Sequence, residues 1–328
     1  MSGPIIVLGW DGLDLELAER FGVAGHFGAH AETIGTYVNP ADSEPHTKEL
    51  WPSMITGLHP DAHGISATTD GETRPDWESD ALTVLARGAD YVLPQRVQTW
   101  AGRQLQDQGA KQTAYGPDYY RERGIDAVVA REGATPISIP NYQTERDRRL
   151  GLDANRERVW AELSIDRAAA GAEFDPQVDT PRIHDIIGRE LGRRLGLTIE
   201  ALHSGAGLVW TWFGALDTVG HIAPAVDAAL ERQYYKLAAA QTAAIRRLAP
   251  DDATVLAVSD HGIQHGEHTH HATVASGERA PVAAIDHVFE VADWIRRQDP
   301  TGRGGAAVDA GEMQAVTERL ASLGYIDR

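Results

Sequence analysis

The chain of 328 residues has no cysteine, few lysines and no long apolar segment. The missing cysteine excludes disulfides, thiolate metal sites and cysteine nucleophiles, and it is typical of a reducing compartment. No segment approaches the roughly 20 apolar residues that a membrane helix needs. The first apolar segment has no basic region ahead of it and ends at Asp11, so we interpret it as a core strand and not as a signal peptide. We therefore expect a cytoplasmic protein without a membrane span.

Positive charge is scarce in this chain. Its net charge is −18, from 48 acidic against 30 basic residues, and lysine occurs only at positions 48, 111 and 236. Binding to a nucleic-acid backbone relies on clustered positive charge, so we expect no nucleic-acid polymer as a partner. A small anionic substrate would need a local source of positive charge, and bound divalent cations supply it in many sites.

Apolar strands alternate with helices along the chain. Hydrophobic residues make up 42% of the sequence, which is enough for one elaborated α/β unit. We predict strands at 5–10, 32–38, 207–213 and 253–259, with a further candidate at 136–140. We predict helices at 14–21, 48–56, 154–171, 180–204, 224–248, 281–297 and 310–323, with Pro224 in the first turn of its helix. This order indicates an α/β fold with a mostly parallel central sheet sandwiched by helices.

The middle of the chain is less regular than its two ends. We expect residues 1–90 and 205–328 to form a metal-binding catalytic core, and 91–204 to form an inserted cap that recognises the substrate. Two interpretations of the arginines in this insertion stay open: a solvated surface paired with neighbouring acids, or a contact with the remote end of a substrate. These arginines are at positions 121, 123, 146, 148, 149, 156 and 158.

Acidic residues follow three of the apolar strands. Asp11 comes after the first strand, Asp217 follows the strand at 207–213 with His221 just beyond it, and Asp260-His261 ends the strand at 253–259. The carboxyl ends of parallel strands meet at the edge where α/β sheets bind ligands. Carboxylates and imidazoles are the ligands of many divalent metals. Taken singly, Asp11-Gly12 is also a common turn and Asp217-His221 a common pair on a helix surface. Together they predict a metal centre.

Thr47 stands at the start of a predicted helix. A hydroxyl at this position lies where backbone N–H groups and the helix dipole favour an anion. A metal that contacts the oxygen makes loss of its proton easier, which would turn Thr47 into a nucleophile.

These motifs resemble the alkaline phosphatase superfamily, and within it the type I phosphodiesterase and nucleotide pyrophosphatase branch. Thr47 precedes Thr56-Gly57 by nine positions, as the nucleophile does in that branch, and the segment ends in the matching Pro60-Asp-Ala-His63-Gly-Ile. Three further motifs agree in order along the chain: Val7-Leu-Gly-Trp-Asp11-Gly-Leu-Asp14, Asp217-Thr-Val-Gly-His221 and Ser259-Asp260-His261-Gly262. The resemblance implies an alkaline phosphatase-like fold.

The resemblance also implies a set of ligands for two ions, either Zn²⁺ or Mn²⁺. Ion A would be held by Asp11, Thr47, Asp260 and His261. Ion B would be held by Asp217, His221 and one later histidine. We prefer His271 for that position because it opens the strand-like segment 272–276, with His268 or His270 as alternatives. Asp14 is interpreted as an acid in the first turn of a helix.

One position departs from the branch. The family often has a phosphate-binding Asn three residues after the nucleophile, and this chain has Leu50 there. Lys48, the backbone N–H after Thr47, or an arginine from the insertion would have to stabilise the phosphoryl charge instead.

The expected activity is hydrolysis of a phosphodiester or pyrophosphate bond in a small phosphorylated substrate, through a phospho-threonine intermediate on Thr47. Alternatives within the superfamily are a phosphomonoesterase, a phosphonate hydrolase and a phosphoryl transferase. An alternative of another class is a non-catalytic relative that only binds metal or ligand.

Overall fold

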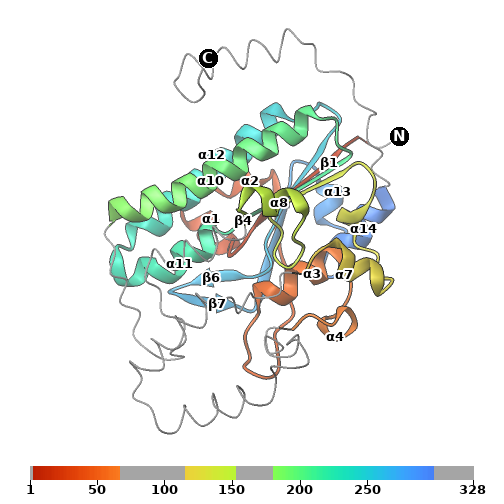
Figure 1. Ribbon diagram of the computed structural model, residues 1–328. Helices are drawn as coiled ribbons and strands as arrows, with labels where there is room; N and C mark the ends of the chain where they lie inside the picture. Colours follow the sequence, from red (N-terminus) through yellow and green to blue (C-terminus); the bar gives the residue numbers. More distant parts are fainter. Residues whose placement is uncertain (1–2, 67–114, 153–179, 299–328) are drawn as a thin grey trace.

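A six-stranded sheet forms the centre of the molecule (Figure 1). The computed structural model describes residues 3–66, 115–152 and 180–298. The strand order is β2-β8-β5-β1-β4-β3, in which β1, β3, β4 and β5 are parallel and β8 runs antiparallel to both of its neighbours. The strands of this sheet are β1 (Ile5–Trp10), β2 (His30–Gly35), β3 (Ala134–Ile137), β4 (Leu208–Phe213), β5 (Thr254–Val258) and β8 (His271–Ser276). A separate hairpin pairs β6 (Gly262–Gln264) with β7 (Glu267–Thr269).

Helices cover both faces of the sheet. Every residue of β1 and of β4 is buried, and alternate side chains of these strands enter two separate apolar cores. This explains why their sequences are uninterrupted apolar runs. One core lies under α1 (Leu15–Arg20), α2 (Ala24–Phe27), α10 (Thr180–His203), α11 (Ala215–Val226) and α12 (Ala229–Leu248). The other core lies under α3 (Thr47–Thr56), α7 (Pro117–Glu122), the 3-10 turn η2 (Val128–Ala130), α13 (Arg279–Val282) and α14 (Glu290–Gln298). Two further short helices are α4 (Pro60–His63) and α8 (Glu145–Leu150).

The predicted α/β fold with a mostly parallel, helix-covered sheet is confirmed. Two helix predictions were wrong in their boundaries. Pro224 lies near the end of α11 and does not begin the next helix. The break comes at Asp227, which is extended and whose carboxylate accepts a hydrogen bond from Ala229 N at 2.8 Å. Asp227 precedes the N-cap residue Ala228, and its carboxylate binds the first N–H of α12 from just outside the helix. The predicted helix at 281–297 is likewise divided, into α13 and α14.

Part of the range expected to form an insertion belongs to the central sheet. Within 91–204, β3 pairs with β4, and α10 packs against β4. The segments 91–114 and 153–179, including the helix predicted at 154–171, lie outside the described residues, as does the helix predicted at 310–323. The cap therefore remains a prediction. Within 3–66, 115–152 and 180–298, none of the helices combines the length and the apolar character needed to cross a membrane.

The contact between Gly9 and Trp51 allows a stability test of the packing of α3 on the sheet. A Cβ at Gly9 would lie 2.5 Å from the Trp51 ring, whereas a Cβ at Gly192 on α10 would meet no atom within 4 Å. We expect Gly9→Ala to lower the free energy of unfolding by about 1–3 kcal/mol through overpacking. We expect Gly192→Ala to raise it by about 0.5–1 kcal/mol, since alanine stabilises a helix interior. Urea denaturation of both variants measures the two effects, and equal shifts would contradict this packing.

Candidate metal centre

The ends of β1 and β4 are joined by backbone hydrogen bonds that place two aspartates side by side. Asp11 N donates to Phe213 O at 3.0 Å, and Asp217 N donates to Asp11 O at 3.0 Å. Gly12 follows with a φ of 76°, and a Cβ at this residue would lie 2.8 Å from Asp217 Cα. Glycine therefore permits both the turn and the close approach of the two chain segments.

Asp11, Asp260 and His261 form the first group of ligand atoms. These atoms lie within 4.8 Å of one another, and all three side chains are buried. His261 Nε2 is 3.4 Å from Asp11 Oδ1 and 3.4 Å from Asp260 Oδ2. Thr47, the first residue of α3, places Oγ1 at 3.3 Å from both Asp11 Oδ1 and His261 Nε2. The structure thus brings together the four residues expected at ion A.

Asp217, His221 and His268 gather beside the first group. Asp217 and His221 lie one turn apart on α11, with His221 Nε2 3.2 Å from Asp217 Oδ1. His268 comes from β7, and its Nε2 is 3.4 Å from Asp217 Oδ1 and 3.0 Å from His221 Nε2. The ligand atoms of Asp217, His261 and His268 also lie within 4.8 Å of one another, so the two groups adjoin at His261.

The structure does not place His271, the histidine preferred from the sequence, in either group. Its Nε2 lies 3.2 Å from Asp14 Oδ2. Successive side chains of a strand point to opposite sides, so on β7 His268 faces Asp217 whereas Thr269 faces the other way and contacts His271. The named alternative His268 therefore replaces His271 in our ligand set. His270, the other alternative, is exposed and is in neither group among the described residues.

The three clustered histidines share one orientation. His221 Nδ1 is 2.9 Å from Gly266 O, His261 Nδ1 is 3.1 Å from Gly262 O, and His268 Nδ1 is 3.5 Å from Glu44 Oε2. A proton on each Nδ1 would be directed at an oxygen, which leaves Nε2 facing the aspartates. Metal-ligating histidines are commonly oriented in this way by a carbonyl or a carboxylate.

The electrostatics of the cluster fit bound cations. In the described structure, both side-chain oxygens of Asp260 and Oδ1 of Asp217 are buried without a hydrogen bond. Burial, together with the charge of Asp217, raises the pKa of Asp260 to about 7. Burial acts against ionisation of Asp217 as well, but the neighbouring His221 and His268 hold its pKa well below the usual range. Buried carboxylates without enough compensating charge are costly, and divalent ions with mixed oxygen and nitrogen ligands would compensate them.

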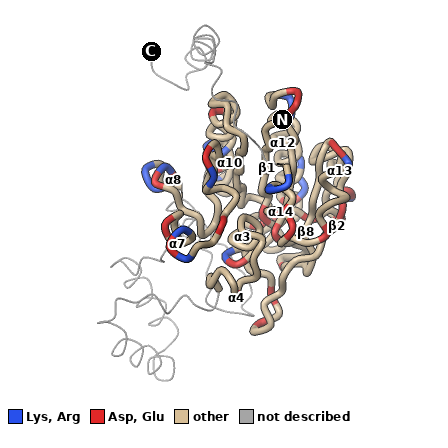
Figure 2. The backbone as a smooth tube through the Cα atoms, turned by 90° about the vertical axis from the view of Figure 1, so that its right-hand side faces the viewer, with Lys and Arg blue, Asp and Glu red and all other residues tan. Residues whose placement is uncertain are grey.

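The arginines expected in the insertion mostly form surface ion pairs where the structure describes them. Figure 2 shows acidic and basic residues interspersed along α7 and α8. Arg123 lies over the Tyr119 ring, 3.8 Å from its centroid. The ion pairs are Arg121 with Asp118, Arg146 with Glu200, and Arg148 with Glu145. These contacts favour the interpretation of the arginines as a solvated surface paired with neighbouring acids. Arg156 and Arg158 lie outside the described residues.

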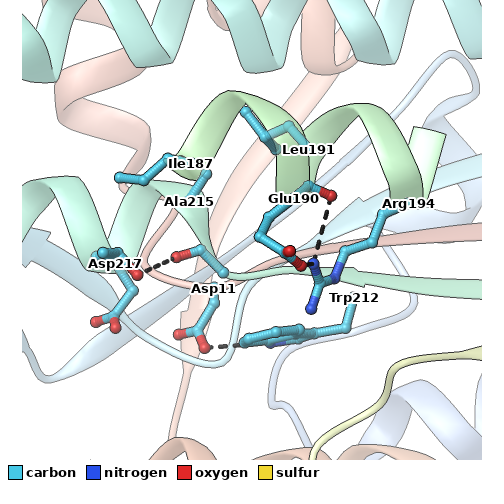
Figure 3. A pocket seen from close by; sticks show the side chains of 10 residues that line it. Asp11, Ile187, Glu190, Leu191, Arg194, Trp212, Ala215 and Asp217 are labelled. Atoms are coloured by element: carbon cyan, nitrogen blue, oxygen red, sulfur yellow. Dashed lines mark hydrogen bonds and ion pairs between the residues drawn. The ribbon is translucent and has the colours of Figure 1, made fainter. Parts of the chain in front are cut away.

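Sequence reasoning missed Arg194, which lies beside the cluster. A cavity of about 40 Å³ reaches from Asp11 and Asp217 to Glu190 and Arg194 on α10, with Trp212 between them (Figure 3). Arg194 is buried, and its Nη1 donates to Glu190 Oε2 at 2.6 Å. The signal was present in the sequence, because Arg194 occupies a position on the buried face of an amphipathic helix. The rest of the cavity wall consists of apolar or small residues: Ile187, Leu191, Gly214, Ala215 and Thr218.

Fold and site together define the class of protein. It is an α/β protein that gathers aspartates, histidines and one threonine hydroxyl at the carboxyl ends of its central strands. The sequence model of the type I phosphodiesterase / nucleotide pyrophosphatase family matches residues 5–323, and the chain belongs to this family. It is therefore a hydrolase of phosphoric ester or anhydride bonds.

Two further comparisons complete the description. Among solved structures, the alkaline phosphatase from the Antarctic bacterium TAB5 is similar to this chain with 12% identity and a TM-score of 0.42, over 91% of this chain and 98% of that one. No curated protein matches the chain significantly.

Trp212 provides a test of how Asp11 is held. Its Nε1 donates to Asp11 Oδ2 at 3.1 Å, whereas Nε1 of Trp210 on the same strand is buried without a hydrogen-bond partner among the described residues. We expect Trp212→Phe to weaken divalent-ion binding by about 10–100-fold, because partners of metal ligands typically contribute this much. Trp210→Phe removes a similar ring without removing a hydrogen bond and is the matched control. Calorimetric metal titration that shows equal affinities in both variants would contradict the role of Trp212.

The raised pKa of Asp260 predicts a pH-dependent stability of the metal-depleted protein. An acid whose folded-state pKa is raised from 3.8 to about 7 stabilises the fold fully only below the lower value. That stability is lost as the pH rises through the higher one. We expect urea denaturation to show lower stability at pH 8 than at pH 5, by up to a few kcal/mol at roughly 1.4 kcal/mol per pKa unit. Asp260→Asn should reduce this difference, and the exposed Asp251→Asn should not. An unchanged difference in Asp260→Asn would refute the assignment.

Proposed function

We propose that the chain hydrolyses phosphodiester or pyrophosphate bonds of small phosphorylated substrates through a phospho-threonine intermediate on Thr47. The observation that carries the proposal is the position of Thr47 Oγ1, which lies 3.3 Å from Asp11 Oδ1 and 3.3 Å from His261 Nε2. A threonine hydroxyl at a helix start, in contact with an aspartate and a histidine of a metal-type cluster, has the surroundings of an activated nucleophile.

Two adjoining ligand sets support the use of two ions, and we propose Zn²⁺ or Mn²⁺. The bound ions would supply Lewis acidity and neutralise the charge of the phosphoryl group. Asp11, Asp260 and His261, with Thr47, are the proposed ligands of ion A. Asp217, His221 and His268 are the proposed ligands of ion B, with His268 in place of the His271 preferred from the sequence. The ligand atoms of the two groups meet at His261, which supports two adjoining binding sites.

The first turn of α3 would receive the phosphoryl group. The first backbone N–H groups of a helix have no partner within the helix and favour an anion. Lys48 is half-buried directly after Thr47, and its carbonyl accepts a hydrogen bond from Asn141 Nδ2 at 2.8 Å, which holds this turn in place. We propose the Lys48 side chain and these N–H groups as the stabilisers of the phosphoryl oxygens.

The proposed reaction consists of two successive displacements at phosphorus. Thr47 Oγ1 forms a bond to phosphorus as the bond from phosphorus to the leaving oxygen breaks, and the proton of the hydroxyl passes to the surrounding solvent or to the leaving oxygen. A water molecule then attacks phosphorus, which releases the phosphate product and restores the Thr47 hydroxyl. Thr47 is the nucleophile in the first displacement and the leaving group in the second.

The cavity beside the cluster supports a substrate with a second substituent on phosphorus. It begins at Asp11 and Asp217, and its only described basic lining residue, Arg194, is paired with Glu190. Because Glu190 neutralises Arg194, the cavity favours an uncharged substituent over a second free phosphate. This favours a diester over a phosphomonoester. A phosphonate hydrolase and a phosphoryl transferase would use the same nucleophile, and a non-catalytic relative would use the ligands without it.

Hydrolysis of chromogenic esters tests the proposal. Metal-depleted protein should be inactive and should regain activity with Zn²⁺ or Mn²⁺, with a higher kcat/KM for an aryl phosphodiester than for the aryl monoester. Thr47→Ala should lower kcat/KM about a thousandfold or more, because it removes the nucleophile itself. Acid quenching with a radiolabelled substrate should trap phosphate on Thr47 in the unmodified protein.

Thr47→Ser is the matched control, since it keeps a hydroxyl at the start of α3 and should retain much more activity than Thr47→Ala. Cleavage of the monoester alone would refute the diesterase assignment. Full activity of Thr47→Ala, or no cleavage with any metal, would refute the proposed nucleophile or the enzyme function.

A further inference from the structure

We propose that Asp14 and His271 form a clamp that holds the β6–β7 hairpin where His268 faces Asp217, so that His271 positions a metal ligand and is not one itself. The Asp14 clamp consists of Asp14, Gln264, Thr269 and His271. The assignment of His268 to ion B rests on the proposed function, whereas the clamp itself rests on contacts between side chains.

The Asp14 carboxylate joins three chain segments. Asp14 is fully buried and caps α1, since its Oδ1 accepts a hydrogen bond from Leu17 N at 3.0 Å. Its Oδ2 accepts one from Gln264 Nε2 at 3.1 Å and lies 3.2 Å from His271 Nε2. Gln264 ends β6, and His271 opens β8 two residues after the end of β7. One buried oxygen therefore joins the first strand of the hairpin to the sheet strand that follows the hairpin. From the sequence we expected Asp14 to act only as an acid in the first turn of a helix. In the structure it also binds Gln264 and His271.

The base of the hairpin packs directly on this carboxylate. Gly262 and Thr269 are opposite each other at the base, and a Cβ at Gly262 would lie 2.5 Å from both Asp14 Oδ2 and Thr269 Oγ1. Only glycine permits so close an approach. Strands of three residues do not form a stable hairpin by themselves, so the hairpin depends on contacts with its surroundings.

The opposite face of the hairpin carries the proposed ligand. Ile263 and His268 are directly paired, and residues so paired have side chains on the same face of the hairpin. Ile263 is buried against α11, where a Cβ at Gly220 would lie 2.5 Å from it. The clamp on one face and Ile263 on the other therefore fix the position of the hairpin. His268 faces Asp217 as a result.

The clamp also connects the two ligand sets. Asp14 lies three residues after Asp11, on the same turn of the chain. His271 Nε2 contacts Asp14 Oδ2 at 3.2 Å and Thr269 Oγ1 at 3.3 Å. These contacts direct the ring nitrogen toward Asp14 and not toward Asp217. A ligand displaced by a fraction of an ångström binds its metal less well, so release of the hairpin should weaken one ion and spare the other.

Zinc titration of the metal-depleted protein by calorimetry tests the clamp. Unmodified protein should bind two ions, and His268→Ala should lose the second. His271→Ala should keep both but bind the second about 10–100-fold more weakly, as expected for a residue that orients a ligand. His271→Gln should recover most of that affinity, because its amide can donate to Asp14. His270→Ala, the exposed neighbouring histidine, should bind both ions normally.

Hydrogen–deuterium exchange of the metal-depleted proteins provides a readout that needs neither metal nor activity. Exchange of residues 262–269 should be faster in His271→Ala and Asp14→Asn than in unmodified protein, and unchanged in His268→Ala. Unchanged exchange in both clamp variants would overturn the proposal. So would loss of the second ion in His271→Ala without rescue by glutamine, which would make His271 a ligand. A protein that binds two ions but cleaves no ester would refute the proposed function and leave the clamp intact.

Discussion

Three buried carboxylates at one edge of the sheet are the constraint on which the rest of the structure depends. Asp11, Asp217 and Asp260 are almost completely inaccessible, and three histidines lie around them. Burial and the charge of Asp217 raise the pKa of Asp260, because the surrounding side chains do not supply enough positive charge to stabilise its carboxylate. Because an uncompensated buried charge opposes folding, such a cluster is retained only where a cation offsets it. Binding of divalent ions should therefore stabilise the fold.

The sheet delivers these carboxylates from strands whose positions are fixed by apolar burial. β1 lies at the centre with β4 and β5 on its two sides, so the residues that follow the three strands emerge together. The helices on the two faces of the sheet contribute different residues to the site. α11 contributes Asp217 and His221 from one core, and α3 brings Thr47 from the other. The proposed nucleophile and the proposed ligands of the second ion thus meet at the edge of the sheet, the place where parallel α/β sheets bind ligands.

The sequence was sufficient wherever a local pattern determines the structure. The buried strands read as unbroken apolar runs, and the start of α3 at Thr47 was predicted within one residue. The sequence was insufficient where contacts between distant segments determine the position of a side chain. The choice between His268 and His271 depends on the register of a hairpin whose strands have three residues each, and on Asp14 from another part of the chain. Arg194 was missed because the cavity that it lines exists only after α10 packs beside β4.

The contrast between the two histidines follows from what each ring nitrogen contacts. The Nε2 of His268 faces an oxygen of Asp217 that is buried without a hydrogen bond, so a metal ion between them would satisfy both groups. The Nε2 of His271 faces a carboxylate that already binds Leu17 and Gln264, and a metal there would compete with these hydrogen bonds. A buried aspartate that accepts hydrogen bonds from a backbone N–H and a side-chain amide holds chain segments together. One whose nearest side-chain partners are imidazole nitrogens has the surroundings of a metal ligand. By this criterion Asp14 belongs to the framework, while Asp217 and Asp260 fit the proposed metal centre.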